Sequence, residues 1–549
     1  MVLQKILAGV ATAGTTATVL TRAGVVRPYS PLVLARLALA LRAWGPGPAG
    51  GFTTLAVRNP DGVGLVDELG SLTFGELQAR SNCLARALAD LGVGEGDGVA
   101  IMARNHRGFI DASIGAAKLG ADVIYLNTAF AGPQLVEVLE RDRPSVLIYD
   151  EEFADLVAGV DVQHRVVAWS EGDHAGETGA PTVQTLIDRY PGHDLTPPRR
   201  HARIVILTSG TTGTPKGAPR SEAGVGAAVS LLHAMPLRHG WRTHIAAPLF
   251  HTWGFAHLAL SMLLGSTIVL QRRFDPEACL RVVRTEKCES MVVIPVMLQR
   301  ILALAPATLA RHDLSRVQVV ASSGSALPGD LATSWMDRFG DHLYSTYGST
   351  EVAYASIATP ADLRAAPSAA GFPAYATTVK IFDDAGAEVP AGEVGRIFVG
   401  NGLLFEGYTG GGRKDMIGAL MSTGDVGRFD ADGRLHVEGR DDEMIVSGGE
   451  NVFPHEVEDC LARHPHVVEA AAIGVDDVDF GKRLRAFVVL DDRSCDEDAL
   501  KGWVRDNLAR YKVPREIVVV DELPRNATGK VLKRELVTWH EPSPAQGDA

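Results

Sequence analysis

The residues best suited to chemistry lie at positions 208–217, which read TSGTTGTPKG and follow an apolar run at 203–207. Glycines let a backbone approach an anion closely, and hydroxyls and main-chain N–H groups can donate hydrogen bonds to phosphate oxygens. A P-loop would need Gly-Lys-Ser/Thr, whereas here Pro215 precedes Lys216 and Gly217 follows it. We therefore expect a phosphate-binding loop of another type. Its candidate residues are Thr208, Ser209, Gly210, Thr211, Thr212, Gly213 and Lys216.

A second candidate segment, STYGSTE, occupies positions 345–351. A flat aromatic ring beside a glycine can stack on a purine, and a carboxylate near a triphosphate can hold the Mg²⁺ that neutralises it. Tyr347 with Gly348, and the carboxylate of Glu351, are the residues of this segment that offer such chemistry. An isolated glutamate is more often an ordinary surface acid, but its place in this heptapeptide favours the functional interpretation.

Two further segments carry charged candidates. Positions 423–425 read TGD, and Arg440 follows fifteen residues after Asp425. A carboxylate that accepts two hydroxyl hydrogen bonds is a common way to hold a ribose diol. Lys530 follows the sequence NATG near the C-terminus. A lysine on a mobile loop can reach into a closed site and stabilise negative charge as a carboxylate attacks an α-phosphate.

Together, and in this order, these segments resemble the motifs of the adenylate-forming superfamily, which includes acyl-CoA synthetases, firefly-type luciferases and the adenylation domains of peptide synthetases. The resemblance extends over residues 72–536. It implies that Tyr347 and Gly348 line the adenine pocket with Gly324 nearby, and that Thr350 lies beside the phosphates. It also implies that Glu351 and Thr208 bind Mg²⁺, that Asp425 and Arg440 hold the ribose, and that Lys530 is catalytic.

The resemblance also assigns roles to the segment EGRDDEMIVSGGENVFPHEVE at 438–458. In this family the C-terminal domain rotates between two half-reactions, around a residue two positions after the arginine, here Asp442. The turn at Ser447, Gly448 and Gly449 resembles the stretch that lines the pantetheine channel of coenzyme A. Glycines suit such a channel because a narrow passage tolerates backbone better than side chains.

The identity of the acid is addressed by PLFHTWGF at 248–255 and SSGSA at 322–326. Amino-acid-activating relatives place an aspartate just after the phenylalanine, where this chain has His251, so an amino acid substrate is disfavoured. His251, Trp253 and Phe255 resemble the aromatic gate and wall of an acyl pocket, and His251 is also a catalytic candidate. Its alternative role is that of an imidazole merely buried in the core. The small-residue side of the pocket is predicted at Ser323 and Ser325.

The motifs lie among alternating elements. Apolar periodicity predicts a helix at 77–91, a strand at 99–102, a helix at 109–119 and a strand at 123–126. This alternation favours a parallel sheet covered by helices. Further strand-like runs occur at 203–207, 267–270, 291–294 and 317–320. The first part of the chain is therefore predicted to be α/β, with more than one sheet.

The texture changes after residue 374 to short strands separated by turn signals, which predicts a small β-rich subdomain. Beyond Arg440, helices at 454–463 and 497–511 and strands at 470–475 and 484–490 predict a compact α+β domain. We expect a boundary at Asp441 and Asp442. The predicted organisation is an extension at 1–50, a large adenylate-forming domain at 51–440, and a small mobile C-terminal domain at 441–549.

Composition narrows the class of partner. The 549 residues carry a net charge of −13, which argues against nucleic acid binding because that would need a basic face. The five cysteines are scattered and lack the paired spacings of zinc or redox sites. A reducing cytoplasm is therefore expected. The sequence leaves the oligomeric state open and is compatible with a dimer.

The first fifty residues differ from the rest, because they contain five basic residues and no Asp or Glu. An apolar stretch at 6–20 is shorter than the roughly 20 residues needed to cross a bilayer. A second stretch at 31–44 sets leucines around Arg36 and Arg42. We expect a segment that contacts the inner face of the membrane. The alternatives are a helical extension packed on the protein itself and a cleaved signal peptide.

These observations predict an ATP-dependent acid–thiol ligase that uses ATP, Mg²⁺ and coenzyme A to convert a small carboxylic acid into its acyl-CoA through an acyl-adenylate. The basic, leucine-rich N-terminus favours a fatty acid as the substrate. Alternatives are an aromatic-acid CoA ligase and a fatty acyl-AMP ligase that loads a carrier protein. A catalytically silent adenylate-binding or membrane-interaction protein is disfavoured by the full set of motifs, which does not by itself exclude luciferase-like oxidation.

Overall fold

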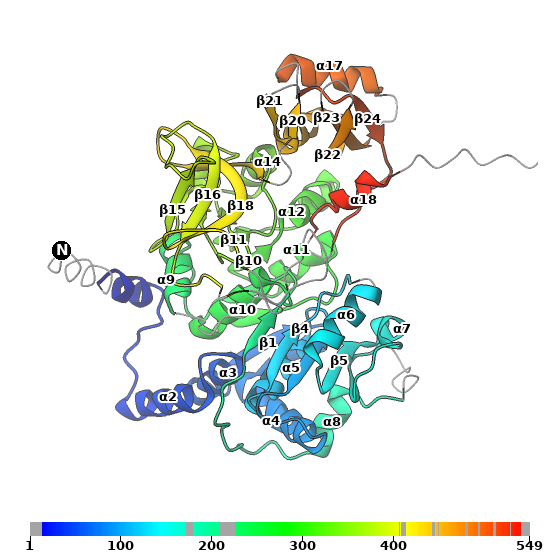
Figure 1. Cartoon of the computed structure of the whole chain (residues 1–549). Helices are drawn as coiled ribbons and strands as arrows, with labels where there is room; N and C mark the ends of the chain where they lie inside the picture. Colours follow the sequence, from blue (N-terminus) through cyan, green and yellow to red (C-terminus); the bar gives the residue numbers. More distant parts are fainter. Residues whose placement is uncertain are drawn as a thin grey trace, which may run out of the picture.

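The computed structural model describes residues 14–130, 132–171, 179–207, 225–405, 407, 413–441, 445–447, 450–477, 481–491, 495–508, 512–526 and 529–539. The predicted phosphate loop at 208–217, the hinge residue Asp442, and Gly448 and Gly449 lie outside these ranges. Within them the chain forms four sheets, three in the larger part and one in the C-terminal part (Figure 1).

The first sheet is parallel throughout and has the strand order β6-β5-β3-β4-β7. Strands β3, β4 and β5 lie at its centre and are almost completely buried, as expected for parallel strands covered on both faces. The strands are β3 (Gly98–Met102), β4 (Asp122–Tyr125), β5 (Val146–Asp150), β6 (His164–Trp169) and β7 (Ile204–Ile206). The helices around it are α4 (Phe74–Asp90), α5 (Arg107–Lys118), α6 (Gly132–Asp142), α7 (Ala154–Val157) and α8 (Val183–Arg189), with a 3₁₀ turn at Glu151–Phe153.

A second, nine-stranded sheet has the order β14-β13-β12-β11-β10-β8-β9-β1-β2, parallel in its middle and antiparallel at both edges. Its strands are β1 (Val63–Asp67), β2 (Gly70–Thr73), β8 (Arg242–Ile245), β9 (Thr267–Val269), β10 (Ser290–Val293), β11 (Val319–Ser322), β12 (Leu343–Tyr347), β13 (Ser356–Ala358) and β14 (Phe372–Pro373). The helices of this part are α9 (Val225–Ala234), α10 (Thr252–Leu264), α11 (Pro276–Thr285), α12 (Pro295–Leu302), α13 (Pro306–Leu309), α14 (Gly329–Phe339) and α15 (Pro360–Ala365).

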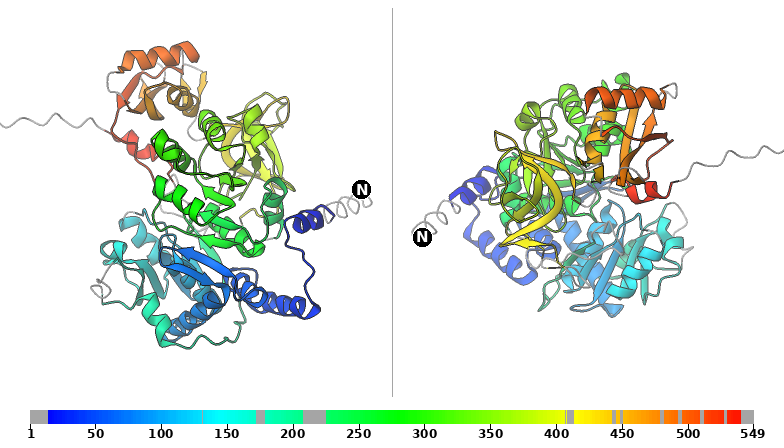
Figure 2. Two further views of the ribbon diagram at one scale, coloured as in Figure 1. Left: turned by 180° about the vertical axis from the view of Figure 1, so that it is seen from behind. Right: turned by 45° about the horizontal axis from the view of Figure 1, so that its top comes forward.

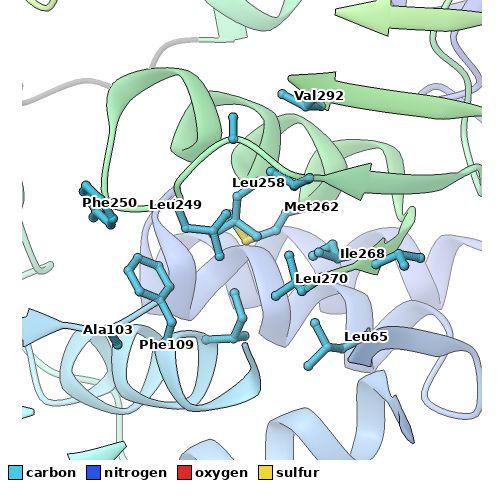
Figure 3. Packing of buried hydrophobic residues seen from close by; sticks show 14 of the residues in the cluster. Leu65, Ala103, Phe109, Leu249, Phe250, Leu258, Met262, Ile268, Leu270 and Val292 are labelled. Atoms are coloured by element: carbon cyan, nitrogen blue, oxygen red, sulfur yellow. The ribbon is translucent and has the colours of Figure 1, made fainter. Parts of the chain in front are cut away.

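The largest core cluster joins these two sheets. Figure 3 shows Leu249 and Phe250, which directly precede α10, and Leu258 and Met262 within it, packed between the second sheet and Phe109 of α5. Because α10 is apolar around most of its circumference, it can be buried from both sides. The start of α10, which carries the predicted aromatic gate, is thereby held at the junction of the two sheets.

A third sheet forms the predicted β-rich subdomain, and a fourth belongs to the C-terminal domain. The third contains β15 (Thr378–Phe382), β16 (Gly395–Gly400), β17 (Met416–Ile417), β18 (Leu420–Phe429) and β19 (Leu435–Arg440). The fourth contains β20 (Ile445–Ser447), β21 (Glu450–Val452), β22 (Val467–Asp477), β23 (Gly481–Leu490) and β24 (Glu516–Val519), with helices α16 (Pro454–Ala462), α17 (Glu497–Asn507) and α18 (Lys533–Val537).

The predicted α/β class is confirmed, and every element predicted in the large domain and after residue 440 is present with small shifts at its ends. The predicted helix at 497–511 is the largest difference, because α17 ends at Asn507. Strand β19 ends at Arg440 and β20 begins at Ile445, which is compatible with the predicted domain boundary between them. Before the first sheet, residues 14–22, α2 (Pro31–Trp44) and α3 (Pro48–Arg58) are helical.

Candidate active site

The geometric centre of the site is the carboxylate of Asp425 on β18. Antiparallel pairing sets Asp425 directly opposite Arg440 of β19, and Arg440 Nη1 lies 3.4 Å from Asp425 Oδ1. Tyr347, at the end of β12, donates from its hydroxyl to Asp425 Oδ2 over 2.5 Å. Three residues predicted as adenine and ribose contacts thus converge from three strands that belong to two different sheets.

The local sequence explains the position of Asp425. Gly424 adopts φ +81°, a left-handed conformation that glycine tolerates best. The hydroxyl of Thr423 accepts a hydrogen bond from Asp425 N over 3.1 Å and lies 3.2 Å from the carbonyl oxygen of Ile397, to which it donates. The TGD sequence therefore forms a bulge within β18 that aims the carboxylate at Tyr347.

Burial raises the pKa of Asp425, against the hydrogen bond from Tyr347 and the positive charges of Arg440, Lys530 and Lys414, all of which favour the ionised form. Burial and the neighbouring carboxylate raise the pKa of Tyr347 well above its usual value. Tyr347 therefore remains a neutral donor at physiological pH. Asp425 is held among cations as an acceptor, the arrangement needed to receive hydroxyl hydrogen bonds from a sugar.

The turn that follows Tyr347 brings Thr350 and Glu351 to the same edge of the second sheet, where both are half-buried. A Cβ on Gly348 would lie 2.3 Å from the carbonyl oxygen of Ala353. Only glycine therefore fits at the first position of this turn without a shift of the backbone.

The backbone of the same turn is anchored to the β-rich subdomain. Asn401, which follows β16, donates to the carbonyl oxygens of Val352 and Tyr354, over 2.8 and 2.9 Å. The main-chain carbonyl of Glu351 accepts from Phe405 N over 2.8 Å. The predicted magnesium ligand is thus fixed by contacts on both sides of the turn.

Lys530 is brought to the site by its neighbour Gly529. A Cβ on Gly529, which has φ +76°, would lie 2.4 Å from Val296 Cγ1 and 3.2 Å from Ile294 Cδ1. A Cβ on the predicted adenine neighbour Gly324 would also meet Ile294, at 3.3 Å. The C-terminal loop thus packs beside Ile294, the residue that the SSGSA segment also contacts. The exposed Lys530 side chain is close enough to Asp425 to stabilise its charge.

Lys414 belongs to the site but was not predicted from the sequence. A Cβ on Gly424 would lie 3.2 Å from Lys414 Nζ and 3.1 Å from Arg440 Nη1, so both cations lie over the TGD bulge of β18. The hairpin of β17 and β18 places Lys414 there, while the adjacent Asp415 binds Arg396 over 2.8 Å. Sequence spacing could not reveal this contact, because it depends on how the hairpin folds back.

The predicted acyl-pocket residues cluster around the start of α10. His251 is the N-cap residue of that helix, and its ring lies 4.5 Å from that of Phe250. Trp253 Nε1 donates to the carbonyl oxygen of Val293 over 3.1 Å, and the Phe255 ring lies 5.5 Å from that of Tyr125. Burial lowers the pKa of His251 to about 3. The imidazole is therefore neutral and poorly suited to proton transfer near pH 7.

The small residues of the predicted pocket lie at the end of β11. Ser323 is half-buried and donates to the carbonyl oxygen of Thr346 over 2.7 Å, which ties this segment to the strand that carries Tyr347. Ser325 is exposed beyond the left-handed Gly324. The predicted channel residue Ser447 ends β20, and its side chain lies outside the described part of the chain.

Among the described residues, no group of three or more His, Cys, Asp or Glu side chains has an arrangement that could hold a metal ion. Mg²⁺ commonly needs only one or two carboxylates when substrate phosphates and waters complete its coordination. The turn that holds Glu351 is suited to that arrangement.

Comparison with known proteins agrees with the geometry. The profile of the AMP-binding enzyme family matches residues 52–409, and that of the AMP-binding enzyme C-terminal domain matches residues 456–530. A feruloyl-CoA synthase from Amycolatopsis sp. is 34% identical over 476 residues, which cover 85% of this chain and 93% of that protein. A 2-succinylbenzoate–CoA ligase from Geobacillus kaustophilus is 34% identical over 494 residues, 88% of this chain and 96% of the relative.

A solved structure is similar over nearly the whole chain. The crystal structure of an anthranilate CoA ligase in complex with anthranoyl-AMP superposes with a TM-score of 0.80 at 28% identity, covering 89% of this chain and 96% of the other. The family profile spans more than half of the chain and includes the strand that brings Tyr347 to its place. The protein therefore belongs to the AMP-binding enzyme family, the adenylate-forming superfamily that its motifs resemble.

Proposed function

We propose that this protein is an AMP-forming carboxylate–CoA ligase. In the first half-reaction a carboxylate oxygen attacks the α-phosphorus of ATP, which gives an acyl-adenylate and releases pyrophosphate. In the second the thiol of coenzyme A attacks the acyl carbon, which gives a thioester and AMP. The observation that carries the proposal is the convergence of Tyr347, Arg440 and Lys530 on Asp425, in a chain whose relatives are named CoA ligases.

In this proposal Asp425 accepts hydrogen bonds from the ribose diol, and Arg440 and Tyr347 hold its carboxylate in place. Lys530 stabilises the charge that develops as the acid attacks, the role in which a preorganised cation is most effective. Glu351 would hold Mg²⁺ together with Thr208 and the substrate phosphates. When bound, that ion neutralises phosphate charge. The loop at 208–217 remains the predicted phosphate-binding loop.

We propose that Lys414 contacts the α-phosphate of ATP or the phosphate of AMP. Its ammonium group lies over the TGD bulge beside Arg440, where both cations are close to the predicted ribose site. Its charge also acts on Asp425 at the centre of that site. A lysine beside a nucleotide site is well placed to bind a phosphate as a point charge.

We propose an aromatic carboxylic acid as the substrate. The fatty acid favoured by the N-terminal composition receives no support from the relatives, whose names include feruloyl-CoA synthase and 2-succinylbenzoate–CoA ligase. A pocket wall built from His251, Trp253 and Phe255 also suits a planar ring. Because its pKa is about 3, His251 acts in this proposal as a neutral wall of the pocket and not as an acid or base.

We propose free coenzyme A as the acceptor and the cytoplasm as the place of action. ATP and coenzyme A are available there, and none of the five cysteines is disulfide-bonded. A carrier protein is the competing acceptor. It differs in one measurable property, since an enzyme that loads a carrier would form acyl-AMP without passing it to free coenzyme A.

The test is a panel of hydroxycinnamic, ortho-substituted benzoic, indole-acetic and fatty acids. Acid-dependent exchange of pyrophosphate into ATP reports adenylation, and AMP release with and without coenzyme A reports transfer. We expect the highest kcat/KM with an aromatic acid and multiple-turnover AMP release only with coenzyme A. A higher kcat/KM with fatty acids would contradict the substrate proposal, and exchange that no acid of the panel stimulates would contradict the activity.

A further inference from the structure

Helix α2 displays an unusual apolar surface. Only Ala40 of its 14 residues is buried, whereas Leu32, Leu34, Leu39 and Leu41 are 62%, 49%, 65% and 47% exposed. Together with Val26, which precedes the helix, these four leucines are five of the twelve exposed large apolar side chains in the described part of the chain. A group of apolar side chains exposed together is normally covered by protein or by lipid.

The exposed helix is held firmly at both ends. Before it, Val19 and Ala23 are buried in a cluster with residues of α9, and His239 N donates to the carbonyl oxygen of Ala23 over 2.8 Å. At its last residue, the ring of Trp44 lies 5.9 Å from Lys118 Nζ in a cation–π contact. Helix α3 then buries Phe52 and Leu55 in the main core. The protein thus presents α2 as a fixed ridge.

The charges on this ridge are all positive. Arg36 and Arg42 are exposed among the leucines, and Arg22 and Arg27 are exposed in the segment before them. No acidic residue precedes Asp61, although the whole chain has a net charge of −13. Such a local excess of arginine on an acidic protein is complementary to a negatively charged surface.

The ridge also lies apart from the catalytic parts. The family profile begins at residue 52, so α2 lies before the matched region. In the three views of Figures 1 and 2, α2 (dark blue) projects from the edge of the molecule away from the C-terminal domain (orange). No described helix is long and apolar enough to cross a bilayer. A contact through α2 would leave the site accessible.

We propose that α2 docks this enzyme on an anionic lipid surface. The leucines enter the boundary between headgroups and acyl chains, and the arginines extend to the anionic headgroups, as in other interfacial helices. Roughly two more turns of apolar helix would be needed to span the membrane. The helix therefore lies in the plane of the interface.

The first test is co-sedimentation of the full chain with phosphatidylcholine vesicles that contain or lack phosphatidylglycerol. We expect binding to the anionic vesicles, and a fall of about tenfold or more in the partition coefficient for the double variant Leu32→Gln, Leu39→Gln. The matched control is Leu69→Gln, because Leu69 is also 62% exposed but lies on the turn between β1 and β2. It should bind like the parent protein.

The second test is charge reversal. Arg36→Glu with Arg42→Glu should lower binding to anionic vesicles by about tenfold or more and should make the remaining binding insensitive to salt. Arg505→Glu, at an exposed position in the last turn of α17, is the control. Acid-dependent pyrophosphate exchange in the absence of lipid should be unchanged in all variants, which shows that they fold.

Three results would overturn the proposal. One is that the parent protein binds neither type of vesicle. Another is equal binding by the α2 variants and their controls. The third is a parent protein that is dimeric without lipid and becomes monomeric when Leu32 and Leu39 are replaced, because α2 would then be covered by a second copy of the chain. Sedimentation velocity distinguishes this last case.

Discussion

At the scale of single residues, the site depends on a carboxylate held among cations. Asp425 receives a hydrogen bond from Tyr347, faces Arg440, and is influenced by Lys414 and Lys530 from two other segments. Burial raises the pKa of Asp425, and the hydrogen bond from Tyr347 and the nearby cations oppose that rise. Each of these cations could contact a different part of the substrates. Single substitutions should therefore distinguish their roles.

Lys530→Ala should lower acid-dependent pyrophosphate exchange by about 100- to 1,000-fold, the usual effect of removing one preorganised charge-stabilising group. Conversion of supplied acyl-AMP to the thioester should change far less, because the charge at the α-phosphate does not develop again in that step. Lys533→Ala is a useful control, since Lys533 instead binds Glu458 over 2.9 Å within the C-terminal domain. Equal losses in both half-reactions would contradict the role given to Lys530.

Lys414→Ala should weaken the binding of AMP about 5- to 30-fold and leave the binding of adenosine unchanged, because only AMP offers a phosphate to the lysine. Calorimetric titration of both ligands measures the difference. Lys414→Arg should retain most of the affinity. Lys380→Ala is the control, because Lys380 on β15 pairs with Glu388 and should matter for neither ligand. A parallel loss for AMP and adenosine would place Lys414 at the ribose instead.

At the scale of elements, short turns with demanding backbones position the chemistry. Gly348 and Gly529 lie where a Cβ would collide with the neighbouring backbone or with Val296. A larger side chain at either position would therefore require the backbone of its own turn to shift. This explains the glycine three residues before Glu351 and the glycine directly before Lys530.

Helix α16 carries a charge cluster that should make the stability of the C-terminal domain depend on pH. His455 lies 3.7 Å from Glu458 and 3.4 Å from Asp459, and Lys533 pairs with Glu458. Burial opposes the charge of His455, but Glu458 and Asp459 outweigh it and raise its pKa to about 9, against the charge of Lys533. The same cluster lowers the pKa of Glu458 to about 2, against the effect of burial.

Because the folded-state pKa of His455 is raised, its stabilising contribution is full below about pH 6.5 and is lost as the pH rises through about 9. We expect the free energy of unfolding of this domain to fall by about 1–2 kcal/mol between about pH 6.5 and 9.5. Hydrogen exchange in α16 measures it. His455→Gln should flatten the profile, whereas His466→Gln, at an exposed pair with Asp491, should not. A slope that survives in His455→Gln would contradict the assignment.

At the scale of the whole molecule, the C-terminal domain is placed so that Lys530 lies near Asp425, the centre of the proposed nucleotide site. Gly529 rests on Ile294 and Val296, and Gln299 of α12 donates to the carbonyl oxygen of Val468 over 2.8 Å. Asp459 of α16 is close enough to Asp330 of α14 for their charges to interact. This arrangement suits the role in adenylation that we propose for Lys530. The second half-reaction would require these contacts to break if the domain rotates as the resemblance implies.

Locking the domains should therefore separate the half-reactions. We expect Gln299→Cys with Val468→Cys, joined by a short bis-maleimide in a Cys495→Ser background, to retain pyrophosphate exchange within about twofold. Thioester formation should fall about tenfold or more, because loss of a required motion affects only the step that needs it. The Gln299→Cys variant treated with a mono-maleimide is the control. Thioester formation at the parent rate by the cross-linked protein would exclude a required rotation.

The sequence alone was sufficient for the family, the α/β class and most of the regular elements. Apolar periodicity and glycine placement are local properties of the chain, so they identify the helix at α4 and the strand at β3 without any tertiary contact. The motif around Tyr347 could likewise be identified from its residue types and spacing alone. The order of the strands within each sheet could not be predicted in this way, because strand pairing joins segments distant in the sequence.

Only the tertiary structure decided which charges meet and which leucines stay exposed. Lys414 reaches the TGD bulge because the hairpin of β17 and β18 folds back over it, and no spacing rule predicts that fold. The neutral state of His251 follows from burial, which depends on packing between two sheets. The leucines of α2 were compatible in the sequence with a membrane contact or with packing on the protein itself. In the folded protein these leucines stay exposed, while the segments before and after α2 are buried against the rest of the chain. Exposure therefore depends on the tertiary structure and cannot be read from the sequence.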